Sequence, residues 1–463
     1  MPRFARRCCR TFAGFSQRSL TLSSVSKWWV GLTVLLVTAS AVRADDSLVA
    51  RIDAIGREAI ERHSVPGLTI GVLRDGKVLI NRGYGIADLE NDVPTRADSV
   101  FCIASVTKNF TAAAILQLVE HGAVSLDDDI GKFIPEFPHK NKGVTIRRLL
   151  NHTAGIHNVT AIAAYWAQVG EPIEPPKLIA LFRDAPLDFE PGTSYAYSNS
   201  GYMLLGAVIE KAGGTSYPQY LRSHFFVPLG LAHTSYCGTA DLVRGRARGY
   251  AREGSGWVNA PYVDMSQGYA AGGICSTTGD LLRWQDALNH GRVLAQNTYQ
   301  EMIARAPGRT YGLGIGGGSN AGHRVLFHGG AIYGFDSMMT DYPDDDVAIA
   351  VLANTRGDAT SDIEGRIARL LFNIPEPVAQ PLTPDAKKSF VGKYHSNRGF
   401  DIAIVAHGEA LFVESEGDPS VRLKYVGNGT FARDDGPDMI EIHGDRLVLT
   451  YYGATRFEAT RIP

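Results

Sequence analysis

Ser105-Val106-Thr107-Lys108 is the stretch of sequence on which the interpretation of this chain rests. A serine and a lysine three residues apart lie one above the other when they sit on a helix. Asn109 to His121 follow as an alanine- and leucine-rich run with helical spacing, and Gly122 is a typical C-terminal stop. We therefore expect a helix over 107–121, with Ser105 at its start, where the helix dipole favours negative charge. A hydroxyl beside an amine in that position is a starting arrangement for acyl transfer.

The tetrapeptide alone is a weak signal, because the same spacing recurs at Ser24 and Lys27 in a segment that resembles an export signal. In residues 1–44, basic residues precede an apolar run, Trp28 to Ala41, that is too short for a durable membrane span. We predict cleavage after Ala44 and a periplasmic or secreted mature chain without a stable membrane span. The arginine- and serine-rich, acid-free composition also fits an organelle transit peptide.

Composition indicates an ordinary globular protein, with 44% apolar and 20% charged residues in a chain of 463 that is long enough for more than one domain. The formal net charge is −2, and the chain beyond the predicted signal has no basic block. Because phosphate contacts need clustered lysine and arginine, we expect no nucleic-acid partner. The sequence leaves the oligomeric state open.

Cys102, Cys237 and Cys275 are the cysteines beyond the predicted signal. Their odd number and wide spacing exclude a disulfide scaffold and a C-x-x-C metal clamp, although one disulfide can form. Cys102 is expected to be a small buried residue rather than a second nucleophile. Because the histidines also lack metal-ligand spacing, we expect no metal and no cofactor.

Residues 45–374 combine strand and helix patterns and form the first predicted domain. Strands are expected at Gly67 to Leu73 and Lys77 to Gly85, joined by an Asp75-Gly76 hairpin turn, and again far downstream at Val347 to Leu352. The remaining elements are a strand at Val100–Ile103 and helices at Leu48–His63, Asn199–Ala212, Leu281–Leu288 and Ser361–Leu371. Strands at both ends with helices between them predict one sheet assembled from distant segments and flanked by helices, in the α+β class.

The C-terminal part of the chain changes character after a proline-punctuated linker at residues 375–385. Residues 386–463 carry only short strand patterns, separated by glycine, aspartate and asparagine turns, and predict a small all-β module. The expected strands are Gly392–Tyr394, Phe400–Val405, Ala410–Glu414, Val421–Tyr425, Met439–Ile442, Arg446–Tyr451 and Arg456–Ala459.

Tyr197-Ser198-Asn199 is the only Y-x-N in the chain and lies just before a predicted helix. A tyrosine in such a loop can be aimed at a site rather than packed. Its phenol becomes a useful base when a neighbouring cation, for which Lys108 is the candidate, lowers its pKa. Asn199 can offer both a donor and an acceptor to a substrate amide. Taken in isolation, a turn tyrosine followed by a capping asparagine explains the motif better than a catalytic role does.

His328-Gly329-Gly330 follows the apolar residues Val325 to Phe327 and is expected on a strand whose glycines allow close approach of a substrate backbone. Alone, it would be an ordinary histidine at a strand edge. A glycine-rich run at Gly312 to Gly317 satisfies G-x-G-x-x-G, but a strand pattern rather than a helix follows it. We therefore predict a flexible hairpin there and no dinucleotide site.

The three motifs in the order S-x-x-K, Y-x-N and H-x-G make the chain resemble the penicillin-recognising serine hydrolases. That superfamily includes class C β-lactamases, D-Ala-D-Ala carboxypeptidases, D-aminopeptidases and related esterases. Leu149 to Ile156, Ala271 to Thr277 and Tyr311 to Gly314 are also similar to segments of this family. The resemblance implies a β-lactamase/transpeptidase-like fold, with an antiparallel sheet flanked by helices and a further helical region. The C-terminal module resembles the lipocalin-like appendages of some members.

The resemblance also implies roles for individual residues. Ser105 would be the acylated nucleophile, Lys108 would take or relay its proton, and Tyr197 would act as general base and protonate the leaving group. Substrate would be bound by Asn199, His328 and Gly330. The backbone N–H groups of Ser105 and Ala331 would form the oxyanion hole.

His328 replaces the lysine that is usual in β-lactamases and is mostly neutral near pH 7. This favours a peptidase or amidase of the carboxypeptidase or D-aminopeptidase type, with a small peptide, amide or ester as substrate. The alternatives are a carboxylesterase, a β-lactamase of the same family, and a catalytically idle penicillin-binding-like receptor.

Overall fold

The structure is a computed structural model that describes residues 46–463 except 63, 141, 239, 358, 397–400, 416–419, 434–437 and 453. The predicted export segment, with Ser24, Lys27 and the cleavage site after Ala44, lies outside the described residues. None of the helices in the described part is long and apolar enough to span a bilayer. Residues 48–463 form one compact unit.

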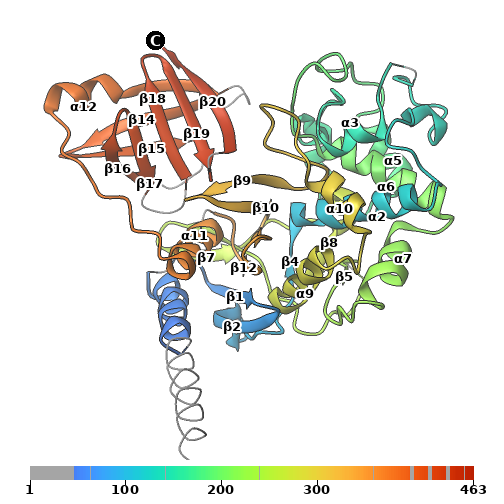
Figure 1. Cartoon of the computed structure of the whole chain (residues 1–463), viewed down its shortest axis with the longest axis horizontal. Coiled ribbons are helices and arrows are strands. Elements are labelled where there is room, and N and C mark those ends of the chain that lie inside the picture. The colour runs from blue at the N-terminus through green and yellow to red at the C-terminus, as the bar shows by residue number, and fades with distance from the viewer. Residues whose placement is uncertain are drawn as a thin grey trace, which may run out of the picture. The chain divides into compact units, whose positions relative to one another are not determined.

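A seven-stranded sheet is the central feature of the larger domain, and all of its pairings are antiparallel. It joins the two ends of that domain, because β1 pairs directly with β12 (Figure 1). In spatial order the strands are β3 (Val93–Pro94), β2 (Lys77–Asp88), β1 (Gly67–Arg74), β12 (Val347–Ala353), β11 (Phe335–Tyr342), β10 (His323–Ile332) and β9 (Gly316–Asn320). The prediction of one sheet assembled from distant segments is confirmed.

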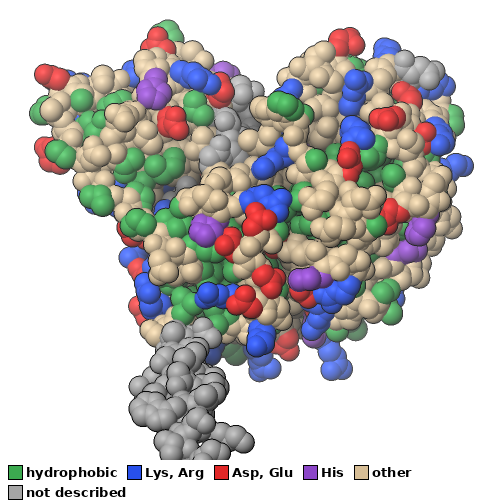
Figure 2. Space-filling view, in the orientation of Figure 1, with side chains coloured by type: hydrophobic (Ala, Val, Ile, Leu, Met, Phe, Trp, Pro, Cys, Tyr) green, Lys and Arg blue, Asp and Glu red, His purple; other side chains and the backbone are tan. Residues whose placement is uncertain are grey.

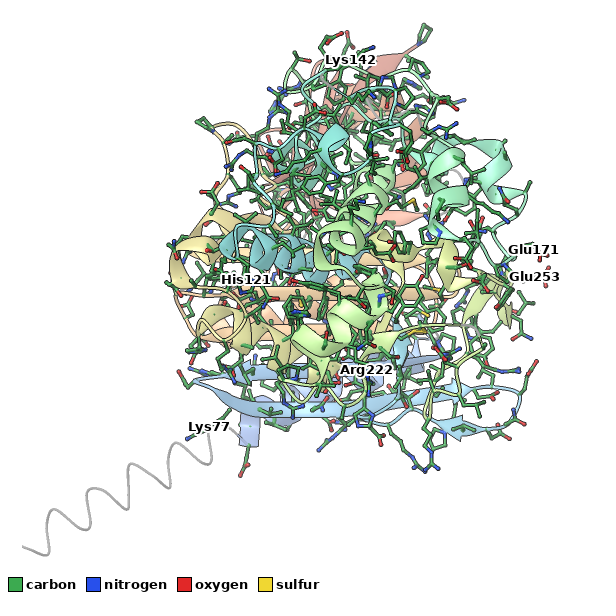
Figure 3. The ribbon with its side chains drawn as sticks, turned by 90° about the vertical axis from the view of Figure 1, so that its right-hand side faces the viewer. Lys77, His121, Lys142, Glu171, Arg222 and Glu253 are labelled. Carbon is green, nitrogen blue, oxygen red and sulfur yellow. A yellow bond between two sulfur atoms is a disulfide. The ribbon has the colours of Figure 1, made fainter. Side chains whose placement is uncertain are left out.

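The β1–β2 hairpin shows why the local sequence was sufficient to predict the strands at this end of the sheet. Asp75 and Gly76 both adopt positive φ angles, 50° and 67°, which is what a two-residue turn between twisted strands requires. Lys77 begins the return strand, and its label marks the hairpin in Figure 3.

Two hydrophobic cores lie on opposite faces of this sheet. Leu352 of β12 packs into the larger core with α9 (Thr278–Asn289), whereas its neighbour Val351 packs into the second core with α11 (Ala359–Phe372). A helix over 46–61 contributes to the second core. Since alternate residues of a strand point to opposite faces, the continuous apolar run of β12 indicates a strand buried on both sides.

Helix α2 (Thr107–Glu120) runs through the larger core and ends one residue before the predicted boundary. It is buried on all sides, which is typical of a helix that is mainly apolar around its circumference. Its C-cap, His121, reaches the surface, as labelled in Figure 3. Around it lie α3 (Ile146–Leu150), α4 (Ala163–Trp166), α5 (Pro175–Ala180), α6 (Asn199–Gly213), α7 (Tyr217–Leu221), α8 (Tyr269–Gly272) and α10 (Gln296–Ile303).

A second, three-stranded sheet holds the cysteines. It consists of β4 (Phe101–Cys102), β8 (Ile274–Ser276) and β5 (Ser235–Tyr236), and a separate hairpin is formed by β6 (Tyr250–Glu253) and β7 (Gly256–Asn259). Cys237 and Cys275 form a disulfide. Cys102 is a free, buried thiol 3.2 Å from the sulfur of Cys275. Burial raises the pKa of this thiol to about 12, so Cys102 is a packing residue rather than a nucleophile.

The C-terminal module is a closed eight-stranded antiparallel barrel, which confirms the predicted all-β class. Its strands are β13 (Gly392–Ser396), β14 (Asp401–His407), β15 (Ala410–Ser415), β16 (Val421–Gly427), β17 (Thr430–Arg433), β18 (Asp438–His443), β19 (Arg446–Tyr451) and β20 (Ala454–Ile462). Within this module, the strand β17 and the helix α12 (Pro384–Phe390) were not predicted. Helix α12 begins inside the predicted linker, where Thr383 caps it and Pro384 takes its first position.

Glu364 of α11 joins the barrel to the larger domain. Its fully buried carboxyl group accepts hydrogen bonds from Tyr451 at the end of β19 (3.0 Å), from Tyr452 directly after that strand (2.7 Å) and from Thr340 of β11 (2.8 Å). Burial raises the pKa of this carboxyl group, and the hydrogen bonds from the hydroxyl groups satisfy its buried oxygen atoms.

Tyr452→Phe should therefore destabilise the protein although it deletes a single oxygen atom. We expect a loss of about 1–3 kcal/mol, the range for a buried polar group that loses a hydrogen-bond partner, because Glu364 stays buried with one donor fewer. Thermal or urea unfolding measures the change, with Tyr425→Phe in the barrel as the matched control. Equal stability of the two variants would contradict the role given to this contact.

Candidate active site

Ser105 lies in a short 3-10 turn, Ala104–Val106, immediately before α2. Ala104 has a positive φ of 42°, a conformation that is strained for a residue with a Cβ and that concentrates at functional sites. Strand β10 lies directly against this turn. A Cβ added at Gly330 would lie 2.2 Å from the carbonyl oxygen of Ile103 and 2.8 Å from the backbone nitrogen of Ser105. Only glycine fits there, and the sequence motif places it correctly.

Lys108 is completely buried, and its Nζ contacts three oxygen atoms. These are Ser105 Oγ at 3.1 Å, Asn199 Oδ1 at 2.8 Å and the backbone oxygen of Ala271 at 2.8 Å. Burial holds the pKa of this amine well below its usual value. A neutral amine has two N–H donors and one lone pair. It can therefore donate to Asn199 and Ala271 and accept the hydroxyl proton of Ser105.

Tyr197 lies in the loop that precedes α6, as the sequence predicted. Ser198 caps this helix by accepting a hydrogen bond from the backbone N–H of Gly201, so the chain turns into the helix directly after the tyrosine. The ring centroid of Tyr197 lies 4.8 Å from Lys108 Nζ. The tyrosine and the lysine therefore face one another although 89 residues separate them in the chain.

Asn199 is fixed at the first position of α6. Its backbone N–H donates to Asn158 Oδ1 at 3.1 Å, and its side-chain oxygen accepts from Lys108. The cap of the helix is Ser198 rather than Asn199, so the simple interpretation of this asparagine as a cap is wrong. The carboxamide oxygen is occupied within the protein, and the amide NH₂ is the group that can meet a substrate.

His328 lies on β10 with both ring nitrogens engaged. Nε2 is 2.7 Å from the hydroxyl of Tyr311, and Nδ1 is 2.7 Å from the backbone oxygen of Gly329. A carbonyl oxygen can only accept, so the network assigns the ring proton to Nδ1 and makes Tyr311 a donor to Nε2. Burial, with a further contribution from Lys108, lowers the pKa of His328 to about 3. The ring is therefore neutral and offers no positive charge to a substrate carboxylate.

This neutrality makes the activity of a His328→Gln variant predictable over pH. Because the pKa of His328 lies near 3, the ring does not titrate between about pH 5 and about pH 8. The ratio of wild-type to variant kcat/KM should therefore stay constant over that interval, whatever its size. A ratio that follows an ionisation in this interval would show that His328 changes charge there.

The glycine-rich run differs from its prediction. A strand, β9, does follow it, in agreement with the exclusion of a dinucleotide site. The expected hairpin is present, because β9 begins within the run at Gly316 and pairs antiparallel with β10, but residues 312–317 are buried. A Cβ at Gly314, where φ is 81°, would lie 2.4 Å from Ala112 Cβ and 2.9 Å from the backbone oxygen of Lys108. The glycines let this segment pack against α2 behind the lysine.

Three contributors were absent from the predicted site residues. Ala271 supplies a carbonyl to Lys108, Tyr311 holds His328, and His152 lies with its ring 4.3 Å from that of Tyr197. All three lie in segments that are similar to segments of the family but to which no role was assigned from the sequence. Their roles depend on contacts made in the folded chain, and a pattern of residue types does not predict such contacts.

Charged side chains around the described domain are mixed in sign. On the face drawn in Figure 2, lysine and arginine alternate with aspartate and glutamate and gather into no large basic patch. Among the described residues, the group whose atoms could hold a metal ion is Cys102, Cys237 and Cys275, and two of these are joined in the disulfide.

Known proteins are similar to this chain in sequence and fold. The family described as Beta-lactamase matches residues 52–373. A putative penicillin-binding protein of Bacillus subtilis, PbpX, is 31% identical over 56% of this chain and 64% of its own length. A D-amino acid amidase from Ochrobactrum anthropi, solved with L-phenylalanine amide, is 27% identical, covers 71% of this chain and 98% of its own, and has a TM-score of 0.62.

The likeness extends into the C-terminal barrel. An octameric penicillin-binding protein homologue from Pyrococcus abyssi covers 89% of this chain and 100% of its own, with a TM-score of 0.65 and 24% identity, which is a likeness of fold. The chain spans less than two thirds of PbpX, the Bacillus relative.

Proposed function

Because the chain belongs to the β-lactamase family of serine hydrolases, we propose that it hydrolyses amides through an acyl-enzyme on Ser105. The substrates are amino acid amides or short peptides, as in a D-aminopeptidase or D-amino acid amidase. The observation that carries this proposal is the buried amine of Lys108, 3.1 Å from the hydroxyl of Ser105.

Acylation begins when Ser105 Oγ attacks the carbonyl carbon of the amide. The hydroxyl proton passes to the lone pair of Lys108, because burial lowers the pKa of this amine and favours its neutral form. The developing oxyanion is stabilised by the backbone N–H groups of Ser105 and Ala331. Tyr197, beside Lys108, gives a proton to the leaving nitrogen, and Lys108 returns the hydroxyl proton to the tyrosine. Water then cleaves the acyl-enzyme by the reverse sequence of transfers.

Substrate choice follows from the groups around the nucleophile. The amide NH₂ of Asn199 is the donor that remains to bind the substrate amide, because its oxygen accepts from Lys108. His328 is neutral and bonded to Tyr311, so a substrate carboxylate finds no cation there. This favours the aminopeptidase or amidase type over the carboxypeptidase type and over β-lactams, which carry a carboxylate. The similarity to a D-amino acid amidase supports the same choice.

We propose in addition that the chain is exported and that its first 44 residues are removed. The basic and apolar composition of that segment supports export. The Cys237–Cys275 disulfide is what an oxidising compartment permits. Mass spectrometry of the mature N-terminus after expression in a Gram-negative host would detect a start at Asp45. An unprocessed, cell-internal chain would contradict export.

The experiment that tests the proposed activity is labelling with a fluorophosphonate probe, followed by a substrate panel. We expect wild-type protein to be labelled and Ser105→Ala to be unlabelled. D- and L-aminoacyl p-nitroanilides, D-Ala-D-Ala peptides, short p-nitrophenyl esters and nitrocefin then rank the substrates, with D-aminoacyl amides turned over and nitrocefin slow. Absence of labelling would indicate an idle receptor, and rapid nitrocefin turnover at nanomolar enzyme would indicate a β-lactamase.

A further inference from the structure

We propose that His152 is a positioning residue for Tyr197, which it holds in place to protonate the leaving group of an amide. His152 touches no reacting atom in this arrangement. It acts through the loop that carries the tyrosine. The inference rests on the proposed function, since Tyr197 has a proton to deliver only if Ser105 is acylated.

The backbone at His152 is the first observation. Helix α3 ends with Asn151 as its C-cap, and His152 follows with a φ of 61°, in the left-handed region. Glycine is the usual residue at that position after a helix, because a Cβ is strained there. A histidine that is 2% exposed and strained in this way is retained for the contacts of its side chain.

Those contacts enclose Tyr197 from both sides. The backbone oxygen of His152 accepts a hydrogen bond from the N–H of Ala196 at 3.1 Å, and its Nδ1 accepts one from the N–H of Ser198 at 3.2 Å. The imidazole ring lies 4.3 Å from the Tyr197 ring, at an interplanar angle of 38°. His152 therefore hydrogen-bonds to the residues on both sides of Tyr197 and packs against the ring of Tyr197. These contacts hold the phenol near Lys108.

His152 also connects the tyrosine to the substrate-binding strand. Its ring lies 4.8 Å from that of Tyr311, the residue that donates to His328. The tyrosine loop and β10 therefore meet at one buried imidazole, although they come from distant parts of the chain.

The hydrogen bond from Ser198 determines which ring nitrogen of His152 carries the proton. A backbone N–H can only donate, so Nδ1 must carry a lone pair and the ring proton must be on Nε2. Phenylalanine at this position keeps the ring and loses the acceptor. Asparagine replaces Nδ1 with Oδ1 at a similar distance from the backbone, and it tolerates the left-handed conformation better than other residues with a Cβ.

Substrates with different leaving groups distinguish a misplaced Tyr197 from a general loss of structure or activity. An amide nitrogen leaves only when it is protonated, whereas p-nitrophenolate leaves without a proton. A defect confined to proton delivery therefore lowers kcat/KM for a D-aminoacyl alkylamide and spares the matching p-nitrophenyl ester. Damage to Ser105, to the oxyanion hole or to the fold lowers both.

We expect His152→Phe to lower kcat/KM for the amide about 10²-fold, within the range for one general acid, and to leave the ester within about threefold of wild type. Tyr197→Phe should show the same selectivity, and the double variant should lose no more than Tyr197→Phe alone, because the two residues act as a unit. His152→Asn should recover most of the amide activity. His139→Phe, at another partly buried histidine that contacts a backbone oxygen, is the control and should leave both substrates unaffected.

Equal losses on amide and ester, or additive losses in the double variant, would overturn the inference. If His152→Phe does not fold, His152→Gly takes its place, since glycine suits the left-handed backbone, and it should show the same selective loss. Failure of the proposed function looks different, because wild-type protein would then turn over neither substrate and would not be labelled at Ser105.

Discussion

Lys108→Met should lower kcat/KM by about 10³-fold or more on amide and ester substrates alike. The variant removes the group that receives the Ser105 proton, and a positioned base contributes typically 10²–10⁴-fold. Methionine has a similar length and fills the same space, but it leaves the oxygen atoms of Asn199 and Ala271 without their donor, so circular dichroism must first show that the variant is folded. Steady-state kinetics on the D-aminoacyl series measures the loss, and Lys211→Met, at an exposed lysine, is the matched control. Retention of more than about a tenth of the activity would exclude Lys108 as the base.

The same variant reports on the protonation of Lys108 through the pH dependence of stability. Burial lowers the pKa of this lysine in the folded protein below the value of about 10.4 expected in the unfolded chain. Between those two values the unfolded state binds more protons, so the free energy of unfolding of wild type rises with pH relative to Lys108→Met. Urea unfolding at about pH 7 and about pH 9.5 should show a larger difference in favour of wild type at the higher pH. A difference independent of pH would mean that Lys108 is as basic in the fold as in water.

Gly330→Val should abolish most activity for a steric reason. A Cβ at this position would lie 2.2 Å from the Ile103 oxygen and 2.8 Å from the Ser105 nitrogen, and both are backbone atoms that cannot turn aside. Strand β10 must then move away from the nucleophile, and the N–H of Ala331 moves with it. Loss of one oxyanion donor costs about 10²–10³ in rate, and we expect at least that.

Gly329→Ala is the matched control for this substitution. Its added Cβ would meet the flexible end of Met338 at 3.3 Å, a contact that a small side-chain movement relieves. The variant should keep its activity close to wild type in the same assay and fold normally by circular dichroism. Comparable losses in the two glycine variants would show that the strand as a whole, rather than its contact with Ser105, is sensitive.

Much of the fold was predictable because its signals are local. The Asp75-Gly76 turn, the alanine-rich helix after Lys108 and the alternation of the barrel strands depend on neighbours in the sequence. Helix α12 was missed because its prolines were taken as a linker, although proline is also at home at the first position of a helix. The glycines at 312–317 were predicted to be flexible because a sequence does not show what packs against them.

The sequence by itself determined the kind of chemistry: a serine and a lysine at helical spacing, a tyrosine before a helix, and glycines beside a histidine. Only the tertiary structure decided the states of these groups. Burial makes the amine of Lys108 a weaker base than in water, and burial also keeps His328 neutral by lowering its pKa. The residues that surround these two groups include distant parts of the chain, such as Ala271 beside Lys108 and Tyr311 beside His328. Protonation depends on the solvent that folding removes and on the partners that it supplies, so the protonation states in the candidate site around Ser105-Val106-Thr107-Lys108 are set only in the folded chain.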